Sequence, residues 1–262
     1  MGCSDIGSCL EEFILDSLNA PIKTLAESFQ KLLSQNIDIS SFASFWSVIV
    51  YALSFFYIFF FLYASMQFVS AGSDVQRRTL AKDSLKNAFV VLVLVQGSYF
   101  LYGLLIDASA ALTRGMLSLL SERFFLPISS IHTNLFFVLL YVAALGATVI
   151  FLLIRFIFVA VGVVLFPVGI FLYFIPPLRE YGLSIIYFFA TLVFVPFFVT
   201  IVFLITDKLL MISFFEELKS LLLIATLAIV NAILLYVTVG ALLKAFMGSK
   251  MIRSMGTVKY FL

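Results

Sequence analysis

Long uninterrupted runs of apolar residues dominate the chain and predict helices that cross a membrane. The run 42–69 carries no charged residue, and the run 135–175 carries Arg155 as its only charge. About 20 consecutive apolar residues are enough to cross a hydrocarbon core of about 30 Å, so each run is long enough for a span. Three shorter runs complete the pattern: 88–112, 183–206 and 221–243.

The run 135–175 is long enough for one irregular helix or for two spans. As one helix it would be about 60 Å long, at about 1.5 Å per residue. A hairpin would have to turn at 154–156, where no Gly, Pro or Asn occurs, whereas Gly162, Pro167 and Gly169 come later. We therefore predict one long third span that kinks or becomes discontinuous near Pro167 and ends at the following pair of prolines.

Residues 10–35 show the pattern of an amphipathic helix rather than of a span. Apolar residues recur every three or four positions from Ile14 to Leu32, and charged residues lie between them. A helix of this kind packs on a membrane surface, on a partner or on the protein's own spans. Its net acidic charge argues against docking on anionic lipid.

The charges of the loops predict the orientation in the membrane. The segment from Lys244 onward holds four basic residues and no acidic one. By the positive-inside rule this tail and the loop 70–87 are cytoplasmic, which places the N-terminus outside. A six-span alternative would place the basic tail outside, so five spans are favoured. The loop 70–87 holds four basic residues: Arg77, Arg78, Lys82 and Lys86.

Composition supports the same class. Hydrophobic residues make up 63% of the chain and charged residues 11%, with a mean hydropathy of +1.18, whereas soluble domains contain about 25% charged residues. The net charge of +2 is too small to indicate a nucleic-acid partner by itself. The prediction is an all-α integral membrane domain at 42–247, with an external segment at 1–41 and a short basic cytoplasmic tail at 248–262.

The motifs of the sequence lead us to expect no enzyme, cofactor or metal site. A single histidine, His132, excludes a pair of histidine ligands, and neither a GxSxG elbow nor a GxxxxGK[ST] loop occurs. Cys3 and Cys9 lack metal-ligand spacing, and they would form a disulfide only in an oxidising compartment. Any energy for transport would come from a gradient or from a partner ATPase.

Arg155 is a charge within a membrane segment, where it costs at least about 2.5 kcal/mol at mid-depth. Three interpretations stand side by side: Arg155 lines a polar path, pairs with Asp107 in the second span, or snorkels to an interface.

A basic stripe precedes the second span. Arg78, Lys82 and Lys86 are four residues apart, which places them on one face of a helix. A stripe of this kind binds either the phosphates of membrane lipids or the phosphate backbone of a nucleic acid.

Two stretches of sequence resemble a known family. The first loop reads SAGSDVQRRTLAKDSLKNAFV, a small-residue turn followed by paired basic residues and Ala-Lys. The third apolar run reads VAVGVVLFPVGIFLYFIPPLREYG, a Gly and Pro break before a polar turn. Over roughly residues 20–247 the chain resembles the polytopic channel subunits of conjugation-type (type IV) secretion, the TrbL-like family. It is most similar to the archaeal branch, the membrane subunit of the crenarchaeal DNA-exchange (Ced) system.

The resemblance implies a non-enzymatic, homo-oligomeric subunit of a DNA-translocating pore. Its implied partners are the lipid bilayer, a DNA substrate, a separate secretion-type ATPase and small membrane or pilin subunits. Many bacterial members carry a long hydrophilic C-terminal domain, and we expect none here. Two alternatives from other classes are a secondary transporter for a small solute and a pilus-assembly platform that conducts nothing.

Overall fold

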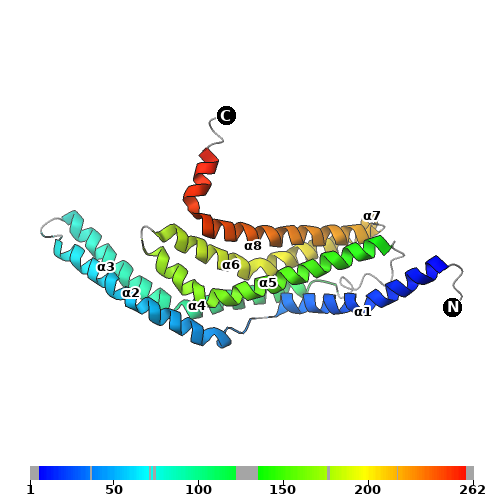
Figure 1. Ribbon diagram of the computed structural model, residues 1–262, viewed down its shortest axis with the longest axis horizontal. Coiled ribbons are helices and arrows are strands. Elements are labelled where there is room, and N and C mark those ends of the chain that lie inside the picture. Colours follow the sequence, from blue (N-terminus) through cyan, green and yellow to red (C-terminus); the bar gives the residue numbers. More distant parts are fainter. Residues whose placement is uncertain are drawn as a thin grey trace. The chain divides into compact units, whose positions relative to one another are not determined.

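The computed structural model describes residues 6–35, 37–70, 72, 75–121, 135–175, 178–216 and 218–257. All regular elements among these residues are helices, which confirms the predicted all-α fold (Figure 1). In chain order they are α1 (Ile6–Ser34), the 3-10 helix η1 (Ser40–Phe42), α2 (Ala43–Ser70), α3 (Val75–Gln96), α4 (Ser98–Leu117), α5 (Leu135–Tyr173), α6 (Arg179–Leu209), α7 (Ser213–Glu216) and α8 (Lys219–Thr257).

Five helices in the described part of the chain are long and apolar enough to cross a membrane, the number predicted from the sequence. Helix α5 continues through 154–156, so the hairpin that six spans would require is not formed there. The chain is therefore a multi-pass membrane protein. The five spans are Ser40–Ser70, Ser98–Leu117, Phe136–Tyr173, Arg179–Leu209 and Lys219–Gly240.

The second span begins later than its predicted start at residue 88, because α3 ends at Gln96 and α4 begins at Ser98. The Ser98 hydroxyl donates to the carbonyl of Val95 at 2.7 Å, a local bond that competes with regular helix geometry. The same hydroxyl accepts a hydrogen bond from the Trp46 indole at 2.9 Å, which ties α2 to the junction of α3 and α4.

The chain is built from two compact units, each assembled from segments that are distant in sequence. The first unit contains Met1–Asn36, Ala108–Phe156 and Phe194–Val237, and the second contains Ile37–Asp107, Ile157–Val193 and Thr238–Leu262. Helices α5 and α6 therefore contribute one half to each unit.

In the first unit, α1 packs on the protein's own spans. Its apolar stripe is buried in one cluster with side chains of α5, α6 and α8. Phe29 of α1 is fully buried, and its ring meets Phe203 of α6 edge-on at 5.2 Å. Lys23 and Lys31 are exposed on the opposite face. Of the three surfaces on which this amphipathic helix was expected to pack, the structure shows it on the protein's own spans. The buried residues of α1 are Ile22, Ala26, Phe29 and Leu33.

In the second unit, α2 and α3 lie side by side as an antiparallel hairpin (Figure 1). Buried positions are three, four or seven residues apart along both helices, the spacing of coiled-coil seams. The turn between them contains Gly72, whose φ of +47° lies in the left-handed region that favours glycine. The buried seam is formed by Val50, Leu53 and Tyr57 of α2 and by Ala81, Ala88, Val91 and Val95 of α3.

A local side-chain hydrogen bond precedes α2. The side-chain oxygen Oδ1 of Asp38 accepts a hydrogen bond from the backbone N–H of Ser40 at 2.9 Å. Hydrogen bonds from the side chain and the backbone of Ser40 hold the pKa of Asp38 below its usual value. The chain thus enters its first span with one of the unpaired N–H groups of the helix start satisfied.

Candidate functional site

The basic stripe predicted from the sequence forms an exposed face of α3. Arg78, Lys82 and Lys86 are all exposed, and Ala81 and Ala88 are buried on the side of α3 that meets α2. We call these three cations the basic face. Its residues follow one another at about 6 Å along the helix axis, given about 1.5 Å per residue.

Contacts with α2 hold the basic face in place. The Ser84 hydroxyl donates to Oε1 of Gln67 at 2.8 Å, and the Phe89 ring lies 5.5 Å from that of Phe61. These contacts fix the rotation of α3 about its axis, so the cations point away from α2. The basic face is therefore set by the packing of the hairpin.

Arg78 also has a structural role that the sequence did not indicate. Its Nε–H donates to the carbonyl of Gly72 at 2.8 Å, across the turn between α2 and α3. Lys82 and Lys86 are therefore the cleaner probes of what the basic face binds.

Arg155 is buried, with 6% of its surface exposed, so it packs inside the protein and is not turned toward lipid or water. This burial argues against snorkelling. Asp107, the partner considered for it, lies in the other unit and is exposed. Their pairing stays a prediction.

The residues predicted to break the third span have packing roles. A Cβ added at Gly162 would lie 2.7 Å from Cζ of Tyr102 and 2.8 Å from Cδ1 of Phe189. Tyr102 is fully buried and donates its hydroxyl to the carbonyl of Val159 at 3.0 Å. The missing side chain of Gly162 is thus what allows α4 and α6 to approach α5 here.

Gly169 has a similar role two residues beyond Pro167. A Cβ added there would lie 2.8 Å from Cγ2 of Ile185, and one added at Gly182 of α6 would lie 2.6 Å from the carbonyl oxygen of Gly169. The backbones of α5 and α6 therefore approach each other closely at these glycines. Helix α5 continues through Pro167 as one element, which favours a kink over a discontinuity, and the break itself stays a prediction.

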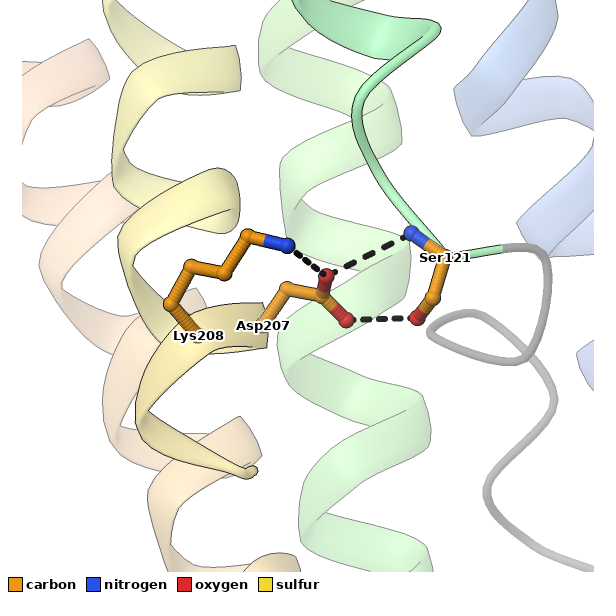
Figure 2. A network of polar contacts seen from close by, with 3 residues as sticks. All are labelled: Ser121, Asp207 and Lys208. Atoms are coloured by element: carbon orange, nitrogen blue, oxygen red, sulfur yellow. Dashed lines mark hydrogen bonds and ion pairs between the residues drawn. The ribbon is translucent and has the colours of Figure 1, made fainter. Parts of the chain in front are cut away.

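A polar network at the end of α6 was not singled out from the sequence. Figure 2 shows the Asp207 carboxylate accepting hydrogen bonds from the Ser121 hydroxyl at 2.5 Å and from the Ser121 backbone N–H at 3.4 Å. Lys208 lies 3.9 Å from the same carboxylate, and its side chain is 58% exposed. In the sequence, Asp207 and Lys208 look like ordinary charges after an apolar run. The partner that distinguishes Asp207 lies 86 residues away.

Buried hydroxyl and amide groups link the helices of the first unit. The Thr206 and Thr226 hydroxyls are 2.9 Å apart between α6 and α8, and the Asn231 amide donates to the carbonyl of Ala144 at 3.0 Å. Oδ1 of Asn231 is buried and has no hydrogen-bond partner among the described residues. Small polar residues of this kind commonly connect helices within membranes.

Several predicted features lie outside the described residues. These are His132, Cys3, the side chains of Cys9 and Arg77, and the side chains of the basic tail from Lys244. Within the described part of the chain, no three His, Cys, Asp or Glu side chains gather closely enough to hold a metal ion.

No protein-family model, curated protein or solved structure matches the chain. The class of the protein therefore rests on its helical fold and on its five apolar spans, which define a multi-pass membrane protein. Membership of the TrbL-like family stays a prediction from the quoted sequence stretches.

Proposed function

We propose that the chain is a non-catalytic channel or scaffold subunit of a conjugation-like machine that moves DNA across the cell membrane. The observation that carries this proposal is the basic face of α3. Three exposed cations line one helix face, and Val93 continues that side of the helix as an exposed apolar residue. A polyanion at the membrane surface is a natural ligand for such a face.

In the proposed orientation the N-terminus is outside the cell and the basic face is cytoplasmic, where the four basic residues of its loop predict it to be. The nearest acidic side chain in sequence, Asp83, is exposed but follows Lys82 directly. Successive residues of a helix point about 100° apart, so Asp83 lies off the basic face. DNA would meet cations there without an interposed carboxylate.

The proposed machine has further parts. The sequence contains no GxxxxGK[ST] loop for a nucleotide, so a separate secretion-type ATPase would supply the energy. Small membrane or pilin subunits and further copies of this chain are the other proposed partners.

The test replaces Arg78, Lys82 and Lys86 with Gln and measures DNA transfer in cells together with DNA crosslinking to the loop. Each lost phosphate contact should reduce the slope of log K against log salt by about 0.7 to 0.9. Binding should weaken without base preference, because phosphate contacts do not read sequence.

Two controls make the result interpretable. A Lys82→Gln, Lys86→Gln pair leaves the bond from Arg78 to the turn intact, and Lys23→Gln with Lys31→Gln removes exposed cations from α1 instead. Membrane level and orientation are confirmed for every variant. Normal transfer by a correctly inserted triple variant would contradict the DNA contact and leave lipid anchoring as the role of the basic face.

A secondary transporter for a small solute is the second proposed function, and the burial of Arg155 in the third span favours it. Arg155→Lys keeps the charge but changes the hydrogen-bonding geometry. If the protein is a transporter, this variant should reduce solute uptake in proteoliposomes while the triple Gln variant does not. A chain that moves no solute in that assay would exclude this second function.

A further inference from the structure

Helix α2 has an exposed apolar face on the side opposite to α3. Its members recur every three or four residues, and no polar residue interrupts them. Their exposed fractions run from 54% to 83%. This face, called the α2 outer face, consists of Val48, Tyr51, Phe55, Ile58, Leu62, Met66 and Val69.

The basic face lies at the level of the C-terminal end of the α2 outer face. The hydrogen bond from Ser84 to Gln67 and the ring contact of Phe89 with Phe61 fix the antiparallel register. In this register Lys82 and Lys86 are level with the last two turns of α2, and Arg78 is level with the turn that follows. Apolar and cationic surfaces therefore face opposite directions from one two-helix element.

The hairpin could stand upright either within the hydrocarbon core or with its end in water, and each placement leaves one of the two surfaces in an unfavourable environment. If the whole hairpin were upright within the hydrocarbon core, Lys82 and Lys86 would be in lipid, which is costly. If the end of the hairpin stood upright in water, Met66 and Val69 would be exposed to water at 71% and 83%. The span Ser40–Ser70 has 31 residues, so it is about 46 Å long against a core of about 30 Å.

We propose that α2 crosses the membrane obliquely, with the α2 outer face bound to lipid acyl chains along its whole length. The basic face is then turned toward the headgroups and the aqueous phase. A hydrophobic stretch that exceeds the bilayer thickness relieves the mismatch by tilting, and flanking basic residues set the direction of the tilt. Because the basic face is attracted to anionic headgroups, the opposite face of the hairpin is held against the acyl chains.

Spin-label accessibility tests this placement. In a background of Cys3→Ser and Cys9→Ser, a nitroxide is attached at Met66→Cys, Lys82→Cys or, as a matched control in the middle of α2, Phe55→Cys. The full chain is reconstituted into vesicles of phosphatidylglycerol and phosphatidylcholine. Collision rates are measured with oxygen, which concentrates in acyl chains, and with a water-soluble nickel chelate. We expect the label at Met66 to favour oxygen as the label at Phe55 does, and the label at Lys82 to favour the chelate.

Two results would overturn the proposal. Access of the chelate to the label at Met66 would show that the hairpin end stands in water. Exclusion of both reagents from the label at Met66 would also contradict it. If the unlabelled Met66→Cys variant then forms disulfides between chains, a second copy covers this face. Val69→Cys serves as the second variant should Met66→Cys fail to insert. The assay contains no DNA, so its outcome is independent of the proposed function.

Discussion

At the scale of single residues, the glycines of α5 determine how closely its neighbours approach. We predict that Gly162→Ala destabilises the protein by about 1 to 3 kcal/mol, the usual cost of overpacking, because the new Cβ meets the rings of Tyr102 and Phe189. The free energy of unfolding in detergent measures this. Tyr102→Phe removes the hydroxyl and should recover part of the loss in the double variant.

Gly146→Ala is the matched control within the same helix. A Cβ at Gly146 meets nothing within 4 Å, so this variant should be neutral or more stable, by up to about 1 kcal/mol from helix propensity. Equal destabilisation by both alanine variants would mean that Gly162 has no special packing role.

Asp207 provides a second prediction at this scale. Asp207→Ala removes the acceptor of both hydrogen bonds from Ser121 and should cost about 1 to 3 kcal/mol. Lys208→Ala should change stability by less than about 1 kcal/mol, because an ion pair at 3.9 Å from a side chain that is 58% exposed contributes little. Thermal unfolding in detergent compares the two variants. A larger loss of stability for Lys208→Ala would mean that Lys208, and not Asp207, stabilises the end of α6.

At the scale of elements, α5 combines a proline with close helix packing. Pro167 is buried inside α5 and has no N–H to donate to the carbonyl of Val163. We predict that Pro167→Ala changes DNA transfer more than it changes the amount of protein in the membrane. Pro21→Ala, which removes an exposed helical proline from α1, is the control. Equal loss of transfer and abundance would mean that Pro167 serves folding only.

The elements also show what a sequence can and cannot predict. The apolar runs predicted five spans, because lipid requires long helices whose backbone groups are all paired. The docking of α1 could not be resolved, since an amphipathic stripe fits a membrane, a partner or a span equally well. From the sequence, Gly162 and Gly169 were interpreted as part of a helix break. Glycine is common both at breaks and at close contacts between helices, so the sequence alone does not distinguish the two. Only the distant residues that face them, such as Tyr102, separate the two cases.

At the scale of the whole molecule, the membrane class follows from composition, whereas the chemistry of the site depends on contacts between distant residues. The spacing of Arg78, Lys82 and Lys86 predicted that they share one face of a helix. The bond of Arg78 across the turn and the hydrogen bonds of Asp207 could not be predicted. Spacing along the sequence does not reveal a partner across a turn or 86 residues away.

The central claim, five spans with the N-terminus outside and the C-terminus in the cytoplasm, is tested most directly by thiol labelling. Ser254→Cys, in a chain with Cys3→Ser and Cys9→Ser, is exposed to a membrane-impermeant maleimide in intact and in permeabilised cells. The native chain, with Cys3 and Cys9 at the other end, is labelled in parallel. We expect Ser254→Cys to react only after permeabilisation and the native cysteines, once reduced, to react in intact cells. Reaction of Ser254→Cys in intact cells would contradict the five-span account.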